Sequence, residues 1–243
     1  MPQSQLTQLK SELRKVANPE KAAFFPRFFK SAPGEYAEGD KFLGVTVPEQ
    51  RKIAKQFKDL PLKQVEQLIM SSWHEERLTG LFILVGQYTK ADEANKKAIY
   101  DFYMAHTRNI NNWDLVDSSA EYIVGPWLED KPEKMEVLQT LAHSELLWDR
   151  RIAMLATLHY IMRGRADEAI IVAEILLNDP HDLIQKAVGW MLREVGKRVD
   201  GELLRVFLKK HAANMPRTTL RYAIEHFTPQ ERGHYLGLAS KAH

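Results

Sequence analysis

The residues of this sequence with the clearest chemical potential are Trp113 and Asp117, which lie four positions apart. Apolar residues recur around them at helical spacing, so the sequence predicts a helix that begins near Trp113 and carries both side chains along one side. The apolar stripe of this helix consists of Leu115, Val116, Ala120, Ile123 and Trp127. An indole ring beside a carboxylate suits a developing cation, because the ring offers π-electron density and the carboxylate offers negative charge. The pair also fits a purely structural role, with a tryptophan between helices and an acid near a helix start.

A second tryptophan, Trp190, lies among cations on a helix predicted from about Asp182 to Arg198. The core stripe of this helix consists of Leu183, Ile184, Ala187, Val188, Met191, Leu192 and Val195. The opposite side carries, at spacings of four, three and four residues, Lys186, Trp190, Arg193 and Lys197. An aromatic ring there can stack on a sugar or base while the cations hold phosphates. Packing of Trp190 against a neighbouring helix pair is the structural alternative.

Arg151 begins a predicted helix that is otherwise nearly all apolar. A buried arginine is costly unless it is paired. It therefore either binds phosphate or pairs, for structural reasons alone, with Asp117 or Asp149. For Asp114, in the first turn of the Trp113 helix, the sequence favours a simple helix-start role.

The elements that position these residues repeat weakly along the chain. The similar segments are HEERLTGLFIL from His74, NNWDLVDSSAEY from Asn111, LWDRRIAMLATL from Leu147 and LIQKAVGWML from Leu183. Their matching positions, separated by 37, 37 and 35 residues, are Arg77, Asp114, Arg151 and Lys186. This spacing is typical of HEAT- or TPR-like arrays. The sequence therefore predicts an all-α, HEAT-like repeat α-solenoid with an extended concave binding face, as a single domain over residues 1–243.

Helix boundaries are well marked, and one irregular stretch separates them. Asn18-Pro19-Glu20 is typical of a helix start, and Thr46 and Glu49 have the spacing of a capping box. Further boundaries are expected at Pro61, Asp92, Pro132 and Asp179-Pro180, and Met215-Pro216 is expected to open the last long helix. The irregular stretch, Ser31 to Gly44, is longer than most helix–helix connections and fits either a binding loop or an insertion.

Composition excludes several classes of chemistry. The 243 residues include no cysteine, which rules out disulfides, thiolate catalysis and cysteine-based zinc sites. HExxH, Walker A, GxGxxG and GxSxG motifs are absent, as are a transmembrane stretch and an apolar leader, so we expect a cytoplasmic protein with no membrane partner. The net charge is only +2, but residues 183–222 hold nine Lys and Arg against three Asp and Glu. Such a local excess suits a polyanion, although a solvated helical surface also accounts for it.

Several segments together resemble the AlkD-type DNA alkylation repair family. They are FLGVTVPEQRKIAK (Phe42 to Lys55), NNWDLVDSS (Asn111 to Ser119), LLWDRRIAML (Leu146 to Leu155), DLIQKAVGWMLREVGKR (Asp182 to Arg198) and MPRTTLRYAIEHF (Met215 to Phe227). They follow the family order over nearly the whole chain. The W-D-x-V-D and I-Q-K-A-x-G-W-x-L-R-E strings carry most of the specificity when taken together.

The resemblance implies a HEAT-like fold that cradles duplex DNA, and an N-glycosylase that removes N3- and N7-alkylated purines without metal or cofactor. It implies that Trp113 and Trp190 are the active-site tryptophans and that Asp117 is the catalytic aspartate. The residues expected to contact DNA are Arg151, Lys186, Arg193, Lys197, Phe28 and Arg217. We further expect a monomer that acts on DNA at the bacterial nucleoid.

This sequence departs from the family pattern at three places. Phe28 stands where the family has a tyrosine, Asp182 and Leu183 replace aromatic residues, and the Ser31–Gly44 stretch is long. Two other functions therefore stay open. The first is a DNA-binding protein of the same fold without catalysis, and the second is a helical-repeat scaffold for protein interactions.

Overall fold

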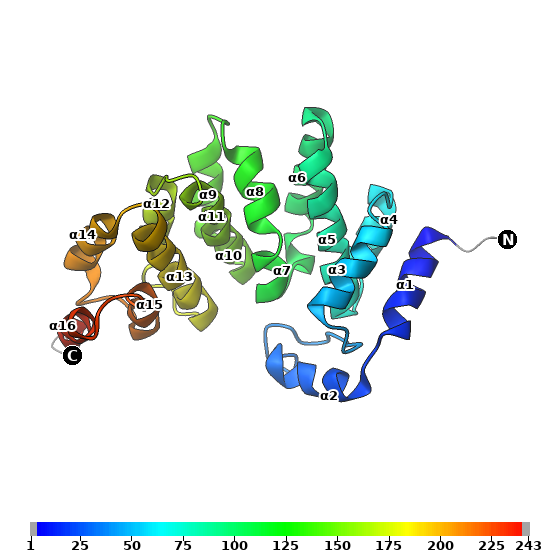
Figure 1. Cartoon of the computed structure of the whole chain (residues 1–243), viewed down its shortest axis with the longest axis horizontal. Coiled ribbons are helices and arrows are strands. Elements are labelled where there is room, and N and C mark those ends of the chain that lie inside the picture. The colour runs from blue at the N-terminus through cyan, green and yellow to red at the C-terminus, as the bar shows by residue number, and fades with distance from the viewer. Residues whose placement is uncertain (1–3, 240–243) are drawn as a thin grey trace. The chain divides into compact units, whose positions relative to one another are not determined.

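The computed structural model describes residues 4–239, which form helices joined by loops (Figure 1). The helices are α1 (Gln5–Lys15), α2 (Pro19–Phe28), α3 (Val47–Gln56), α4 (Leu62–Ile69), α5 (His74–Lys90), α6 (Glu93–Ala105), η1 (Thr107–Asn109), α7 (Trp113–Asp117), α8 (Ala120–Leu128), α9 (Lys134–Ala142), α10 (Leu147–Ala156), α11 (Leu158–Ile161), α12 (Asp167–Leu176), α13 (Asp182–Arg198), α14 (Gly201–His211), α15 (Arg217–Ala223) and α16 (Pro229–Ala239). Within residues 4–239, β-structure is limited to one isolated bridge between Lys41 and Trp73. The predicted all-α, helical-repeat fold is confirmed.

The chain divides into two compact units between Ile123 and Val124, inside α8. In the first unit, the long helix α5 packs against α3, α4 and α6. In the second unit, the equally long α13 packs against α10, α12, α14 and α15. Each unit is thus built around one long helix that shorter helices surround. The single domain expected over residues 1–243 stays a prediction.

The predicted apolar stripes form the core, with two exceptions. Every stripe residue of α13 is buried except Leu183, which is half-buried in the first turn. In α7 and α8 the stripe is fully buried except at Trp127. The Trp127 ring is half-buried, and the Nζ atom of Lys131 lies 4.2 Å from its centroid. The expectation that Trp127 belongs to the core was therefore too strong.

The predicted helix starts are largely correct. The side chain of Asn18 caps α2 by accepting a hydrogen bond from the amide of Lys21 at 3.0 Å. Thr46 does precede α3, but its side chain makes no capping hydrogen bond, so the expected capping box is not formed. Instead, the buried Gln50 side chain donates to the carbonyl of Val45 at 2.9 Å and holds the entry to the helix.

The helix after Met215-Pro216 is shorter than predicted. It is the seven-residue α15, and a second helix, α16, begins at Pro229. Thr228 and Glu231 have the capping-box spacing, and their side chains bond to each other and to both backbone amides at this start. Because proline also disfavours helical geometry in the residue before it, the chain stops and restarts here.

The irregular stretch from Ser31 to Gly44 is firmly anchored at its end. The buried carboxylate of Glu75 accepts hydrogen bonds from the consecutive amides of Leu43, Gly44 and Val45 at 2.8–3.3 Å. Gly44 has a φ of +77°, and a Cβ atom there would lie 2.1 Å from the carbonyl oxygen of Asn18. Only glycine fits this position. The stretch therefore has a defined structural end that ties α2 to α5.

Candidate active site

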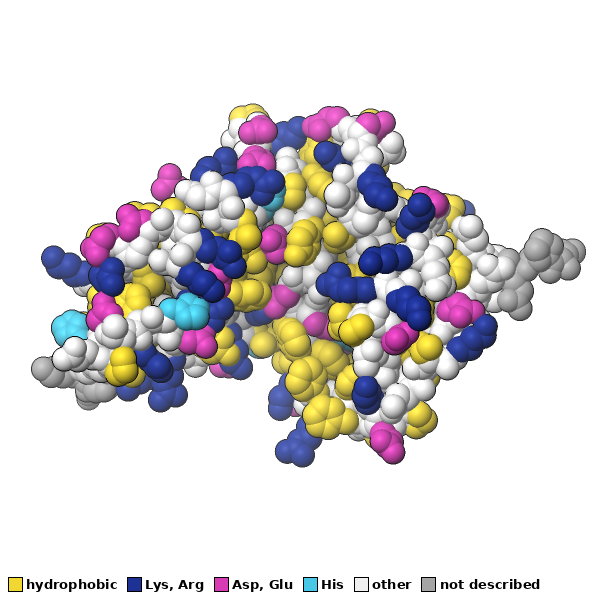
Figure 2. Space-filling model, viewed as in Figure 1, with side chains coloured by type: hydrophobic (Ala, Val, Ile, Leu, Met, Phe, Trp, Pro, Cys, Tyr) yellow, Lys and Arg dark blue, Asp and Glu magenta, His cyan; other side chains and the backbone are white. Residues whose placement is uncertain are grey.

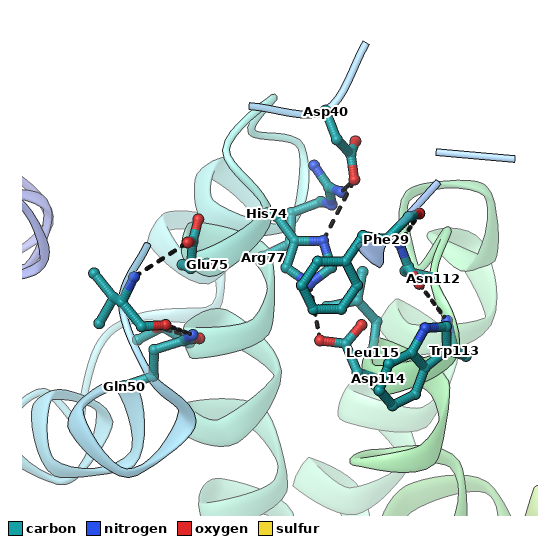
Figure 3. Close-up of polar contacts among 12 residues, drawn as sticks. Phe29, Asp40, Gln50, His74, Glu75, Arg77, Asn112, Trp113, Asp114 and Leu115 are labelled. Atoms are coloured by element: carbon teal, nitrogen blue, oxygen red, sulfur yellow. Dashed lines mark hydrogen bonds and ion pairs between the residues drawn. The ribbon is translucent and has the colours of Figure 1, made fainter. Parts of the chain in front are cut away.

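Trp113 and Asp117 are the first and last residues of the short helix α7. The fully buried Asn112 fixes the start of this helix, because its Oδ1 atom accepts a hydrogen bond from the Trp113 amide at 2.8 Å. Its Nδ2 atom donates to the carbonyl of Phe29 at 3.3 Å. The beginning of α7 is thereby fastened to the end of α2, as Figure 3 shows.

An aromatic cluster surrounds Trp113. The Phe28 ring meets the indole edge to face with centroids 5.7 Å apart, and the Phe29 ring stacks on it at 5.8 Å. Phe29 in turn contacts the ring of His74 at 4.4 Å and stacks on Phe42 at 5.5 Å. Phe29 and Phe42 are buried, whereas Phe28 is 48% exposed and Trp113 is half-buried. Figure 2 shows the hydrophobic side chains that α2 leaves at the surface. The cluster thus has a fixed interior and an accessible aromatic edge.

A buried charge network lies directly behind this cluster (Figure 3). Arg77 donates to Oδ2 of Asp40 at 2.5 Å, and Nδ1 of His74 lies 3.4 Å from the same oxygen. Nε2 of His74 lies 2.8 Å from Oδ2 of Asp114. Burial alone would lower the pKa of His74, but the carboxylates of Asp114 and Asp40 outweigh burial and raise that pKa to about 9. His74 is therefore an imidazolium at neutral pH, and both ring nitrogens donate hydrogen bonds.

Asp117 is half-buried at the end of α7, where the helix breaks. The side-chain hydroxyl of Ser119 lies 2.6 Å from the carbonyl of Leu115 and 2.9 Å from the Tyr103 hydroxyl. A serine that bonds back to the preceding turn bends a helix, and this one is also held from outside by Tyr103. The break separates α7 from α8, so Trp113 and Asp117 share a five-residue helix of their own.

The predicted residues of the second unit lie mainly on α13, as expected. Trp190 is half-buried, and Lys197 is exposed and forms no ion pair within residues 4–239. Lys186 is paired with Asp182 at 2.6 Å. Arg193 is paired with Glu194 at 3.1 Å and also with Glu225. A phosphate at Lys186 or Arg193 would therefore have to compete with a carboxylate already present.

Arg151 is only 4% exposed, and its Nη1 atom donates to the carbonyl of Leu183 in the first turn of α13 at 2.6 Å. The two alternatives for Arg151, a phosphate contact and a structural pairing with Asp117 or Asp149, both stay predictions. Arg217 is exposed, although its Nη1 atom donates to the carbonyl of Leu236 at 2.6 Å.

In the first unit, Phe28 contacts Trp113, which shares the short helix α7 with Asp117. In the second unit, Trp190 shares α13 with the predicted cations, and Arg151 bonds to the first turn of that helix. The expected convergence of Trp113 and Asp117 with Trp190 stays a prediction. Sequence reasoning missed His74, Asp40 and Phe29, which hold Trp113 in place. It also treated Asp114 as a simple helix-start acid, whereas this side chain is buried against His74. One signal was available, because His74 and Arg77 lie one turn apart at the start of a repeat segment that is mainly apolar from Leu78 to Leu84.

Two negative findings concern the described residues, 4–239. No helix in that range is both long and apolar enough to cross a membrane. No three His, Asp or Glu side chains there are grouped so that they could hold a metal ion.

The fold and this site define a helical-repeat protein with an aromatic–carboxylate centre. Residues 9–227 match the family model of the DNA alkylation repair enzymes, and the chain therefore belongs to that family. A solved structure of a predicted DNA alkylation repair enzyme from Enterococcus faecalis is similar, with a TM-score of 0.67 and 18% sequence identity. The likeness covers 88% of this chain and 97% of that chain, and at this identity it supports the fold alone. No curated protein matches the sequence.

Proposed function

We propose that the protein is a monofunctional DNA glycosylase that excises N3- and N7-alkylated purines from duplex DNA in base excision repair. Membership of the DNA alkylation repair family supports this activity. The observation that carries the proposal is the pairing of an accessible aromatic edge, Phe28 and Trp113, with the carboxylate of Asp117 on the same short helix. This combination suits a substrate that is already cationic and becomes more so at its sugar during the reaction.

The reaction needs no metal or cofactor. An N3- or N7-alkylated purine carries a positive charge, which weakens its bond to C1′ of the deoxyribose. When that bond breaks, the electron pair goes to the base and neutralises it, and positive charge develops on the sugar. Asp117 stabilises this charge and orients a water molecule, whose oxygen bonds to C1′ while its proton passes to the carboxylate or to solvent. The products are the free base and an abasic site.

The tryptophans stabilise the same charge by packing against the sugar. Trp113 does so from a position that Phe29 and Asn112 fix, and we propose Trp190, half-buried on α13, as the second aromatic contact to the substrate. Each cation–π contact of this kind contributes on the order of 1–2 kcal/mol when it is shielded from water. Since about 1.4 kcal/mol corresponds to a tenfold change in rate, these contacts add to the effect of the Asp117 carboxylate on a bond whose leaving group needs no general acid.

The cations of the second unit hold the DNA backbone. Lys197 and Arg217 are exposed and provide direct phosphate contacts, whereas Lys186 and Arg193 exchange carboxylate partners for phosphates. Arg151 contributes its positive charge to binding of the DNA backbone from a buried position beside α13. We propose that the protein acts as a monomer, in the cytoplasm, on DNA at the bacterial nucleoid.

Base release from methylated DNA tests the activity directly. Duplex DNA treated with a methylating agent is incubated with the protein, and the freed bases are separated by chromatography. The wild-type protein should release 3-methyladenine or 7-methylguanine, and Asp117→Asn should release no more than a protein-free control. Thermal unfolding of both proteins verifies that the variant is folded.

The same proteins and DNA also distinguish the glycosylase from the two alternative functions. Salt-sensitive binding to duplex DNA without any base release would indicate a DNA-binding protein that has no catalysis. Absence of salt-sensitive duplex binding would favour a helical-repeat scaffold for protein interactions. Equal base release by the wild type and Asp117→Asn would exclude the proposed role of the carboxylate.

A further inference from the structure

A pocket lies in the first unit at the end of α5 opposite His74. The second half of α3, the loop to α4, the last turns of α5 and the start of α6 enclose a volume of about 800 Å³. Small-molecule sites in proteins have volumes of this order. Since α5 has 17 residues, its two ends are separated by about 24 Å, and the pocket is distinct from the aromatic cluster around Trp113.

The floor of the pocket is apolar, and the space above one of its glycines is unfilled. Its buried residues include Ala54, Phe82, Ile83 and Ile99. Gly86 is exposed on α5, and a Cβ atom built on it would meet nothing within 4 Å. The space above Gly86 is therefore open, and a ligand can approach the helix backbone closely there.

The rim of the pocket is basic. It carries four exposed cations, Arg51, Lys55, Lys58 and Lys90, and a single acid, Asp59. Within residues 4–239, none of the four forms an ion pair, in contrast to Lys186 and Arg193 of the second unit. The Arg51 guanidinium instead lies 4.0 Å from the centroid of the Phe82 ring. Figure 2 shows Lys and Arg side chains gathered over α3 and its neighbours. Unpaired cations above an apolar floor attract a negatively charged group.

We propose that this pocket binds a small organic anion with an apolar body, whose carboxylate, sulfonate or phosphate lies at the lysine rim. An apolar floor alone would suit a neutral ligand, and the unpaired cations add the requirement for negative charge. A single nucleic-acid strand fits less well, because strand-binding grooves present exposed aromatic rings for stacking. The aromatic ring of this pocket, Phe82, is 8% exposed and is covered by Arg51. Duplex DNA held through its phosphates needs no such ring, so the experiment below includes duplex DNA as a competitor. The inference uses none of the residues of the proposed glycosylase site.

The fluorescence of anilinonaphthalene sulfonate, an anion with an apolar body, tests the proposal on the full-length protein. We expect one saturable site per chain, confirmed by calorimetry. Gly86→Trp fills the open space and should abolish binding at that site. The triple variant Lys55→Gln, Lys58→Gln, Lys90→Gln should weaken binding about tenfold, since each screened contact contributes modestly.

Matched controls separate the pocket from general charge and apolarity. The triple variant Lys21→Gln, Lys52→Gln, Lys63→Gln removes the same charge from exposed positions outside the pocket and should bind like the wild type. Binding of phenylnaphthylamine, a neutral analogue, should be lost in Gly86→Trp but retained in the pocket triple variant. Thermal unfolding confirms that each variant is folded, and Gly86→Phe replaces Gly86→Trp if that variant is not.

Two results would overturn the proposal. The first is binding of anilinonaphthalene sulfonate that neither pocket variant changes, or that both triple variants weaken equally. The second is displacement of the probe by unmodified duplex DNA, together with weakened duplex binding in the pocket triple variant. The pocket would then be part of the DNA-binding surface. Both results are independent of base release, so failure here leaves the proposed glycosylase activity intact.

Discussion

Nε2 of His74 lies 2.8 Å from Oδ2 of Asp114, the residue that directly follows Trp113. The bond joins α5 to the first turn of α7 behind the aromatic cluster, where Phe29 contacts both His74 and Trp113. The position of the Trp113 ring is therefore linked to His74 through two neighbours, Asp114 and Phe29. We regard His74 as a positioning residue.

The first prediction is that stability falls as pH rises through the titration of His74. Its pKa is raised from 6.5 in the unfolded chain to about 9 in the folded protein, so the stabilisation is complete below about pH 6.5 and is lost by about pH 9. The loss is on the order of 3 kcal/mol. Urea unfolding of the wild type and His74→Gln between pH 6 and pH 9.5 should show a difference that shrinks with pH. His226→Gln, at an exposed position, is the control, and a difference that is constant with pH would contradict the prediction.

The second prediction concerns the cause of this pH dependence. Asp114→Asn keeps a hydrogen-bonding side chain beside His74 but removes the nearest negative charge. The pKa of His74 should then fall, and the loss of stability should move to lower pH. Titration of the His74 ring by NMR measures the shift directly. An unchanged titration midpoint would show that Asp40 alone sets the charge state of His74.

The third prediction concerns the exposed ring of Phe28. Phe28→Ala removes an edge-to-face contact with Trp113 of about 1 kcal/mol, and single-turnover base excision should slow several-fold. Phe24→Ala is a matched control, because that ring is 58% exposed and stacks on Phe28. Phe28→Tyr should leave stability unchanged and tighten duplex binding, since the hydroxyl adds a donor for phosphate. Equal rates for Phe28→Ala and Phe24→Ala would argue against a role for this ring at the site.

The fourth prediction concerns Arg151. Arg151→Ala leaves the Leu183 carbonyl without its charged donor, and stability should fall by about 2 kcal/mol. If Arg151 also supports phosphate binding, its loss should weaken binding to modified and unmodified duplex alike. Arg150→Ala, which removes the ion pair with Asp179, serves as a control for destabilisation alone. Weakened binding to one lesion only would contradict a backbone role.

Local signals in the sequence predicted much of the fold. The boundaries of α13 agree with the prediction because its apolar stripe is uninterrupted, and the start of α2 agrees because Asn18 and Pro19 act within one turn. The break after α7 was not predictable, because Ser119 bends the chain together with Tyr103, which lies 16 residues earlier. The length of α15 was misjudged because the helix start at Thr228-Pro229 was overlooked.

In the candidate site, too, local spacing was predictable from the sequence and long-range contacts were not. Trp113 and Asp117 share a helix side through their spacing alone, so the sequence was sufficient to pair them. The surroundings of Trp113 depend on contacts over long separations. His74 reaches Asp40 and Asp114 across 34 and 40 residues, and Asn112 reaches Phe29 across 83. No periodic pattern encodes such partners, because each depends on how separate helices pack.

The anchoring of the Ser31–Gly44 stretch by Glu75 makes it a place where the chain tolerates substitutions. The three amides that Glu75 holds fix one end, and the bond from Asn112 to the Phe29 carbonyl fixes the other. Between them, residues 32–34 are exposed, although Gly34 has a φ of +81° that favours glycine. Substitutions in the exposed part of the stretch, at Ala32 and Pro33, should therefore leave the geometry of the aromatic cluster unchanged. A fluorescent group attached at the exposed Ala32, and not at Gly34, would likewise follow the protein without disturbing the aromatic cluster.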